Sequence, residues 1–352
     1  MPVAPALLAP APPVLRALPT PLPGSTSAPL GITRSGLVVG HVRGPRARHP
    51  QAVVWRDGDP VVLGRGTPVG CNAHDEVIGT DAAVGAAVLW TGGRARPLVP
   101  PGAERSAGLG IADTGTAAVL GVRGGEQAVW TWRAGRWRCV GPGAHAVIGP
   151  RGDLAVRGPG GTRVHFGGWG PGLPVLAPRG GPPPEPVCVN AHGDVLFDLP
   201  DGHHHRAALW RGGRLTDLGT LGGRVTRTRT AGAGFGPHLN DAGEVAGTST
   251  TADGLIHAFR WRAGDLVDLT PRNRTGSVAH SINARGDVAG VEVAAAAAGE
   301  DARLWPRHGD PVEYPSTGEH HYLAWVALAP TARWLVAADE GPGRGRRLVS
   351  SR

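Results

Sequence analysis

Lysine is absent from this chain of 352 residues, and all 36 of its Lys-or-Arg positions are arginine. Tyrosine, phenylalanine and methionine are also scarce, with two, four and one residues respectively. So few aromatic side chains argue against a surface on which nucleic-acid bases stack, because such platforms need exposed rings beside the arginines. No apolar stretch approaches the length that crosses a bilayer, so we predict no membrane span.

Cysteine is equally sparse. Cys71, Cys139 and Cys188 lie far apart in the sequence, and no C-x-x-C pair exists. This spacing argues against a disulfide framework and against a thiolate metal site. We expect all three to be buried free thiols.

Motifs of known catalytic centres are missing as well. The chain has no H-E-x-x-H, no G-x-S-x-G, no P-loop and no dinucleotide-binding fingerprint. The sequence therefore names no catalytic residue and no cofactor, and we expect a protein without enzymatic activity.

The N-terminus does not have the pattern of a secretory signal. Its start carries no charged segment, and Pro5, Pro10, Pro12 and Pro13 interrupt its apolar stretch. We therefore predict a cytoplasmic protein.

What the chain does have is a repeat. The step W-x-x-G begins at Trp55, Trp90, Trp132, Trp169, Trp210 and Trp261, and Trp305 continues the series with one inserted residue. The spacing averages roughly 42 residues, which is typical of four-stranded β-propeller blades. A turn rich in Asn, Asp and Gly precedes each of these tryptophans, as in Asn240–Gly243 and Asn283–Gly286.

The apolar segments between these turns are too short for helices. Leu37–Val39, Val195–Phe197 and Glu244–Ala246 are each bounded by turn residues within a few positions. Short apolar runs at this spacing predict an all-β chain.

A last, incomplete copy of the repeat indicates how the ring closes. Residues 325–349 contain segments that resemble the first three strands of a repeat, while Pro13–Leu18 resembles a fourth. Pairing the two would complete a blade and cover an open edge. We predict one propeller domain over residues 1–352 with eight four-stranded blades, and seven blades with a packed extension is the alternative. Residues 1–28 form a Pro-rich segment that includes the closing strand, and the repeats span approximately 29–65, 68–99, 107–141, 144–177, 186–222, 235–270, 278–316 and 323–350.

Four phrases of the chain resemble the bacterial HAF-repeat family, which is named for its His-Ala-Phe step. They are LTDLGTLGG (Leu215–Gly223), LNDAGEVAGTS (Leu239–Ser249), HAFRW (His257–Trp261) and INARGDVAG (Ile282–Gly290). The match is strongest over residues 205–290. Members of that family are described mostly as extracellular repeat proteins of unknown function. The resemblance thus implies a repeat fold and offers an extracellular location as the alternative, but it supplies no catalytic residues.

The charge balance has two interpretations. The formal net charge is +8, which is typical of proteins that bind nucleic acid or another anionic surface. An excess of arginine over lysine, with abundant alanine, glycine and proline, is also what the codon bias of a high-GC genome produces. We favour codon bias and keep polyanion binding as the alternative.

Three consecutive histidines are the densest group of possible metal ligands. His203, His204 and His205 follow Asp198 and Asp201 within a few residues. Adjacent residues on one strand point to opposite faces, so we interpret the group as a solvated loop. A zinc site made of His203, His205, Asp198 and Asp201 is the weaker hypothesis.

The loops opposite the tight turns vary most in length and charge, and variable loops on a rigid scaffold are the expected binding face. His41–Pro50, Asp198–Arg206 and Thr220–Pro237 are among these predicted loops. We predict a monomeric, non-catalytic propeller that binds a protein or a glycan on this face. A propeller enzyme that acts on a small molecule at the channel mouth, or a polyanion-binding module, is the alternative. The candidate binding residues are Arg43, Arg46, Arg48, His49, Arg224, Arg227, Arg229, His203, His204 and His205.

Overall fold

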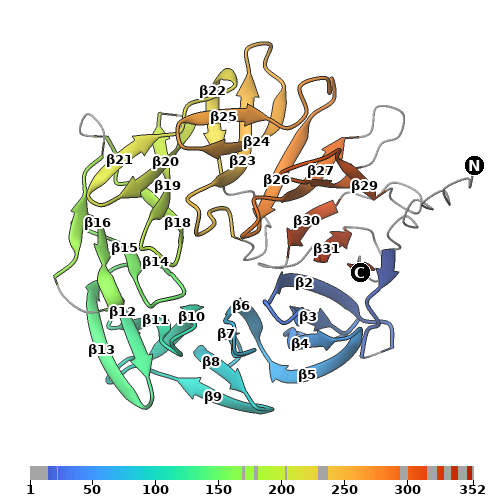
Figure 1. Ribbon diagram of the computed structural model, residues 1–352. Coiled ribbons are helices and arrows are strands. Elements are labelled where there is room, and N and C mark those ends of the chain that lie inside the picture. Colours follow the sequence, from blue (N-terminus) through green and yellow to red (C-terminus); the bar gives the residue numbers. More distant parts are fainter. Residues whose placement is uncertain are drawn as a thin grey trace, which may run out of the picture.

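The computed structural model describes residues 15–21, 23–168, 171–177, 181–202, 204–228, 237–293, 300–314, 323–328, 334–339 and 347–350. These residues form eight four-stranded antiparallel sheets, which are arranged in a ring (Figure 1). The predicted all-β propeller with four-stranded blades is therefore confirmed. No helix in the described part of the chain is long and apolar enough to cross a membrane.

Seven of the sheets each consist of four consecutive strands, and we number them as blades 1–7. Blade 1 contains β2 (Thr26–Ile32), β3 (Val38–Arg43), β4 (Gln51–Arg56) and β5 (Asp59–Arg65). Blade 2 contains β6 (Thr67–Cys71), β7 (Val77–Asp81), β8 (Ala86–Thr91) and β9 (Arg94–Leu98). Blade 3 contains β10 (Arg105–Ile111), β11 (Ala117–Arg123), β12 (Glu126–Arg133) and β13 (Arg136–Pro142). Blade 4 contains β14 (His145–Ile148), β15 (Leu154–Gly158), β16 (Gly161–His165) and β17 (Leu173–Val175), with a short 3-10 turn, η1 (Phe166–Gly168), before β17.

The remaining blades follow the same order. Blade 5 contains β18 (Glu185–Val189), β19 (Val195–Asp201), β20 (His204–Arg211) and β21 (Arg214–Asp217). Blade 6 contains β22 (Gly222–Arg227), β23 (Val245–Thr251), β24 (Ile256–Arg262) and β25 (Asp265–Asp268). Blade 7 contains β26 (Ser277–Ile282), β27 (Val288–Val293), β28 (Glu300–Trp305) and β29 (Val312–Tyr314).

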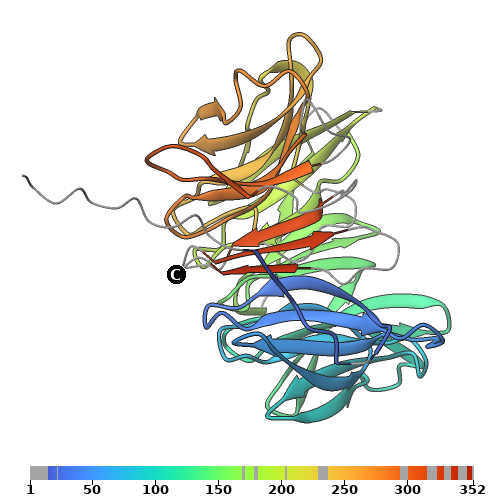
Figure 2. The ribbon, with the colours of Figure 1, turned by 90° about the vertical axis from the view of Figure 1, so that its right-hand side faces the viewer.

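The eighth sheet joins the two ends of the chain. It contains β30 (Leu323–Leu328), β31 (Trp334–Asp339), β32 (Arg347–Ser350) and β1 (Leu15–Ala17). In its outer pair, Leu15, Arg16 and Ala17 lie opposite Val349, Leu348 and Arg347. The sheet lies between blade 7 and blade 1, where β30 contacts β26 and β27 while β2 contacts β30 and β31 (Figure 2).

The alternation of strands within each blade divides the ring into two faces. The tight turns after the first and third strands lie on one side, here called the turn face. The hairpins between the second and third strands lie on the other side, here called the loop face. First strands of neighbouring blades contact one another from β2 through β6, β10 and β14 to β18, so they surround the centre of the ring (Figure 1).

Blade 6 departs from the predicted repeat. We expected Thr220–Pro237 to be a loop between blades, yet residues 222–227 form β22 and pair with β23. The prediction was wrong there because the segment lacks the apolar alternation of a strand. Five other first strands in blades 1–7 carry a bulge, as between Pro29 and Gly31. Blade 6 differs from these blades, because its β22 ends at Arg227. Further along the chain, the carbonyl oxygen of His238 accepts a hydrogen bond from the backbone N–H of Ala246 in β23.

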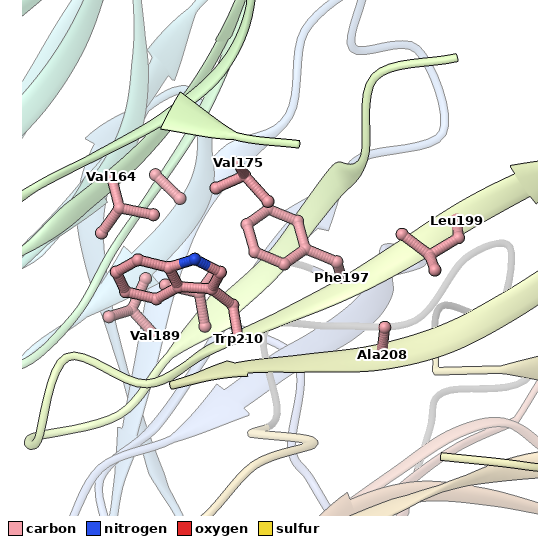
Figure 3. Close-up of a cluster of buried hydrophobic side chains, with 9 residues drawn as sticks. Val164, Val175, Val189, Phe197, Leu199, Ala208 and Trp210 are labelled. Atoms are coloured by element: carbon pink, nitrogen blue, oxygen red, sulfur yellow. The ribbon is translucent and has the colours of Figure 1, made fainter. Parts of the chain in front are cut away.

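The repeated tryptophans hold neighbouring blades together. Trp55, Trp90, Trp210, Trp261 and Trp305 are all buried. Trp210 in blade 5 packs against Ala155, Val164 and Val175 of blade 4, together with Phe197 of its own blade (Figure 3). Trp132 of blade 3 is only half-buried, and Trp169 lies outside the described residues. The repeat therefore places its large aromatic ring between blades, where it fills the core.

The cysteines only partly match the expectation of buried thiols. Cys139 is exposed, because it lies on β13, the outermost strand of blade 3. Cys71 and Cys188 are half-buried residues that carry enclosed thiols, and burial raises the pKa of each to about 12. All three are free cysteines.

Candidate functional site

On the turn face, side-chain hydrogen bonds join neighbouring blades. Asn240 of blade 6 donates from Nδ2 to the carbonyl oxygen of Asn283 in blade 7, at 3.0 Å. Asn190 and Asn72 make the equivalent bonds to Asn240 and Ala112, at 3.1 and 3.0 Å. The side chain of each Asn also accepts a hydrogen bond within its own turn. Asn240 Oδ1, for example, accepts one from the backbone N–H of Glu244. The turn signature of the repeat thus also links neighbouring blades.

On the loop-face side, the inner strands carry one position that can be compared across blades. It is the first-strand residue that lies opposite the fourth residue of the second strand. In blades 1, 2, 3 and 7 this residue is small or apolar, namely Ala28, Thr67, Ala107 and Val278. In blades 4, 5 and 6 it is ionisable, namely His145, Glu185 and Arg227. Charge at this level of the ring is thus concentrated in three adjacent blades.

An ion pair and a histidine–carboxylate contact join blade 4 to blade 5 at this level. Glu185 Oε1 lies 3.1 Å from His145 Nδ1, and Glu185 Oε2 lies 3.0 Å from Arg157. Arg157 is the strand partner of His145. The side chains stay partly open to solvent, with 25 % of Glu185 and 44 % of Arg157 exposed. They can therefore be reached from outside the fold.

A second contact continues this polar layer into blade 6. Asp198, the strand partner of Glu185, is buried and accepts a hydrogen bond from Thr228 Oγ1 at 2.9 Å. Arg227, immediately before Thr228, is exposed and makes no ion pair with the described residues. We call His145, Arg157, Glu185, Asp198, Arg227 and Thr228 the inner polar layer.

The predicted binding residues fall on three blades. Arg43, Arg46, Arg48 and His49 lie at the loop-face end of β3 and in the following loop, and the three arginines are exposed. Arg224 and Arg227 are exposed on β22 of blade 6, whereas a loop was expected there. Blade 1 is not adjacent to blade 6 in the ring, so the structure does not join the two arginine groups (Figure 1). Arg229 lies outside the described residues.

The histidine group also differs from the predicted loop. His204 and His205 are half-buried residues of β20, opposite Asp201 and Pro200, while His203 lies outside the described residues. The second and third strands of blade 5 extend further than expected, because Leu199 packs in the core and continues the strand. Asp198 is engaged by Thr228, and no group of three possible metal ligands comes together in the described part of the chain.

One buried acid–base pair does not belong to this layer. His257 Nδ1 lies 2.8 Å from Asp268 Oδ2, and Asp268 also accepts a hydrogen bond from the backbone N–H of Thr270. The His257 side chain is almost fully enclosed between strands. This pair links the third and fourth strands of blade 6, as the pair of Arg206 and Asp217 does in blade 5.

Sequence reasoning missed His145, Arg157 and Glu185. The tryptophan-based alignment emphasises the turns and the third strands, whereas His145 and Glu185 begin first strands and Arg157 lies near the end of a second strand. An alignment of the first strands would have detected His145 and Glu185, since Ala28, Thr67 and Ala107 occupy the equivalent position in blades 1–3.

The comparisons with known proteins show the fold alone. No family model matches the chain, and no curated protein matches it, so the resemblance to HAF-repeat proteins stays a prediction. The β-propeller domain of the Trilobed protease from Pyrococcus furiosus is similar in structure, with a TM-score of 0.54 and 9% identity over 92% of this chain and 95% of that one. The Pyrococcus horikoshii acylaminoacyl peptidase gives a TM-score of 0.53 and 11% identity over 93% of this chain and 51% of that one. The Pyrococcus furiosus domain is described as having an open velcro topology, whereas β1 pairs with β32 here.

Proposed function

We propose that this protein is a non-catalytic binding propeller that holds a charged segment of a protein partner against its inner polar layer, on the loop-face side of blades 4–6. The observation that carries this proposal is the concentration of His145, Glu185 and Arg227 at a position that is uncharged in blades 1, 2, 3 and 7.

Stability does not account for this concentration. A partly exposed ion pair such as Glu185–Arg157 typically contributes only about 0–1 kcal/mol to folding. Blades 1–3 form the same four-stranded sheet with Ala or Thr at the inner position. Exposed charged side chains that the fold does not need are available to a ligand. A ligand of complementary charge binds with greater specificity and a faster association rate.

The mixture of signs favours a polypeptide over the other predicted partners. Glu185 and Asp198 lie among His145, Arg157 and Arg227, so the layer is not uniformly positive, as a polyanion site would be. A sugar-binding surface usually presents aromatic rings, yet most of the repeated tryptophans are buried between blades. A peptide that carries both an acidic and a basic side chain complements this layer best.

We also propose that the eighth sheet acts as a full blade and closes the ring, as opposed to a seven-bladed ring with a packed extension. Support comes from the three residue pairs between β1 and β32 and from the contacts of β30 with blade 7 and of β2 with β30 and β31. Such closure holds the first and last blades together and covers a strand edge. It would provide the rigid frame that a preformed binding face requires.

The binding proposal is tested by selection from a phage-displayed random peptide library, with a glycan array run in parallel. We expect the wild-type protein to enrich peptides that carry both signs of charge, and the double variant Glu185→Ala, Arg157→Ala to lose them. Thermal unfolding checks that the variant is folded. Enrichment of no peptide together with binding to glycans would refute the peptide assignment, and equal enrichment by the double variant would refute the site.

A further inference from the structure

Two arginines pair with one buried carboxylate at the turn face, between blades 6 and 7, and a third arginine lies beside them. Glu244 is 1 % exposed, and its Oε1 lies 3.5 Å from Arg262 Nε and 3.3 Å from an Arg307 nitrogen. Arg260, two residues before Arg262, donates to the carbonyl oxygen of Gly286 at 3.1 Å. This group, here called the arginine cluster, lies on the face opposite the inner polar layer.

Only one of the nearby acids forms ion pairs with the cluster in the described part of the chain. Glu244 Oε2 accepts a hydrogen bond from Asn240, so a single oxygen serves both Arg262 and Arg307. Asp287 accepts hydrogen bonds from Asn283 and from the backbone N–H of Arg307, and it forms no ion pair with a guanidinium of the described residues. Asp265, across the hairpin from Arg262, is exposed and forms no ion pair with the described residues.

Blade 5 shows what a balanced pair looks like at the same place in the repeat. Arg211, which follows Trp210 as Arg262 follows Trp261, binds Asp194 through two hydrogen bonds of 3.0 and 2.7 Å. Burial opposes ionisation of Asp194, but its hydrogen bonds with Arg211 and Asn190 outweigh that effect and lower its pKa. There one arginine meets one carboxylate at close range.

Arg260 lies within the electrostatic influence of both the arginines and the acids. Burial has the largest effect and lowers its pKa, Glu244 and Asp287 raise it, and Arg307 and Arg262 lower it. At the position of Arg260, blades 1, 2 and 5 carry Val54, Leu89 and Leu209. The guanidinium of Arg262 is 64 % exposed, so its donors are open to solvent beside this crowded group.

We propose that the arginine cluster is a binding site for an oxyanion, either a carboxylate or a phosphate group, held by Arg262 and Arg307 at the turn-face junction of blades 6 and 7. Guanidinium groups match the planar geometry of such anions and bind them through paired, charge-assisted hydrogen bonds. A bound anion would neutralise the positive charge that Glu244 leaves unbalanced.

The test measures binding of inorganic phosphate and of acetate by calorimetry and by the rise in melting temperature, with chloride at matched ionic strength as the reference. Arg262→Gln should weaken binding by about tenfold or more, the usual loss when a hydrogen bond to a charged group is removed. Arg133→Gln, the equivalent exposed arginine of blade 3, is the matched control and should leave binding unchanged. Preference for phosphate or for acetate identifies the group that the site takes.

Glu244→Gln separates a binding role from a structural one. Removal of the internal carboxylate should tighten anion binding severalfold, even though it weakens the contacts of the turn. If that variant does not fold, the comparison of Arg262→Gln with Arg133→Gln decides alone. Absence of anion binding to the wild-type protein, or equal binding by Arg262→Gln and Arg133→Gln, would overturn the proposal.

Discussion

Asn240 in blade 6 donates a hydrogen bond from its side-chain amide to the backbone carbonyl oxygen of Asn283 in blade 7, at 3.0 Å. The same amide holds Glu244, and Asn240 is itself buried. The preference of asparagine for turns does not explain why Asn240 is buried, because an asparagine in an exposed turn does not need a buried side-chain amide. Asn240 and Asn283 thus connect the local repeat to the ring.

Replacement of Asn240 tests this connection. Asn240→Ala should destabilise the protein by about 2–4 kcal/mol, because it removes the amide that donates to the Asn283 carbonyl oxygen and to the buried Glu244 Oε2. Urea unfolding measures the change. Thr114→Ala, at an exposed position of the equivalent turn in blade 3, is the control and should cost less than about 1 kcal/mol. Equal small effects of the two substitutions would show that the inter-blade bond contributes little.

The tryptophan series offers an internal comparison of buried and half-buried rings. Trp261→Ala should destabilise by roughly 3–5 kcal/mol, because the ring fills the core between blades 5 and 6. Trp132→Ala should cost clearly less, since Trp132 is half-buried and has Arg96 over its ring at 5.5 Å. Chemical denaturation of both variants measures the difference, and similar losses would contradict the assignment of Trp261 to the core.

Closure of the ring is tested at β1. Deletion of residues 1–17 removes the strand that pairs with β32 but keeps Leu18 and Pro19, whose carbonyl oxygen binds Trp55. The open edge of β32 should then cause aggregation or a lower melting temperature. Arg16→Pro, which puts proline opposite Leu348, should act in the same direction. A monodisperse deletion variant with an unchanged melting curve would favour seven blades.

Acid stability should depend on His280. Burial, with the nearby His238 second, lowers the pKa of His280 from 6.5 to about 3. The unfolded chain therefore gains a proton below pH 6.5 that the folded chain does not accept until about pH 3. Stability should fall as the pH falls through this window, by at most about 1.4 kcal/mol per pH unit from this group.

A substitution isolates that contribution. His280 is the bulged residue of its first strand, where blades 1–3 have Leu30, Val69 and Leu109. His280→Leu should therefore fold and should lose stability more gradually than the wild type between about pH 6 and pH 4. Denaturant unfolding at several pH values measures both slopes. Identical slopes would show that His280 does not govern acid stability.

Repeated features were predictable from the sequence because each copy supported the others. The tryptophan spacing and the turn residues predicted a four-stranded propeller, and Trp210 and Trp261 are buried in the cores between blades. Residues that break the repeat were not predictable in this way. Residues 222–227 lack apolar alternation, yet they form β22 and pair with β23.

The candidate functional site was the part of the structure that the sequence predicted least well. Arg227 was selected for its charge, but His145, Arg157 and Glu185 come from two other blades, and only the register of the strands puts His145, Glu185 and Arg227 at equivalent positions. Single-sequence motifs cannot express that relationship. The arginine cluster was missed for the same reason, because Arg262 and Arg307 come from two blades and meet at Glu244.

The most direct measurement of the central claim is the dissociation constant of a library-selected peptide for Glu185→Gln, compared with Glu126→Gln. Glu126 is an exposed residue of the loop-face hairpin of blade 3, outside the inner polar layer. We predict that Glu185→Gln weakens binding about tenfold or more, equivalent to about 1.4 kcal/mol, while Glu126→Gln leaves it unchanged. Wild-type affinity in the Glu185→Gln variant would contradict the account.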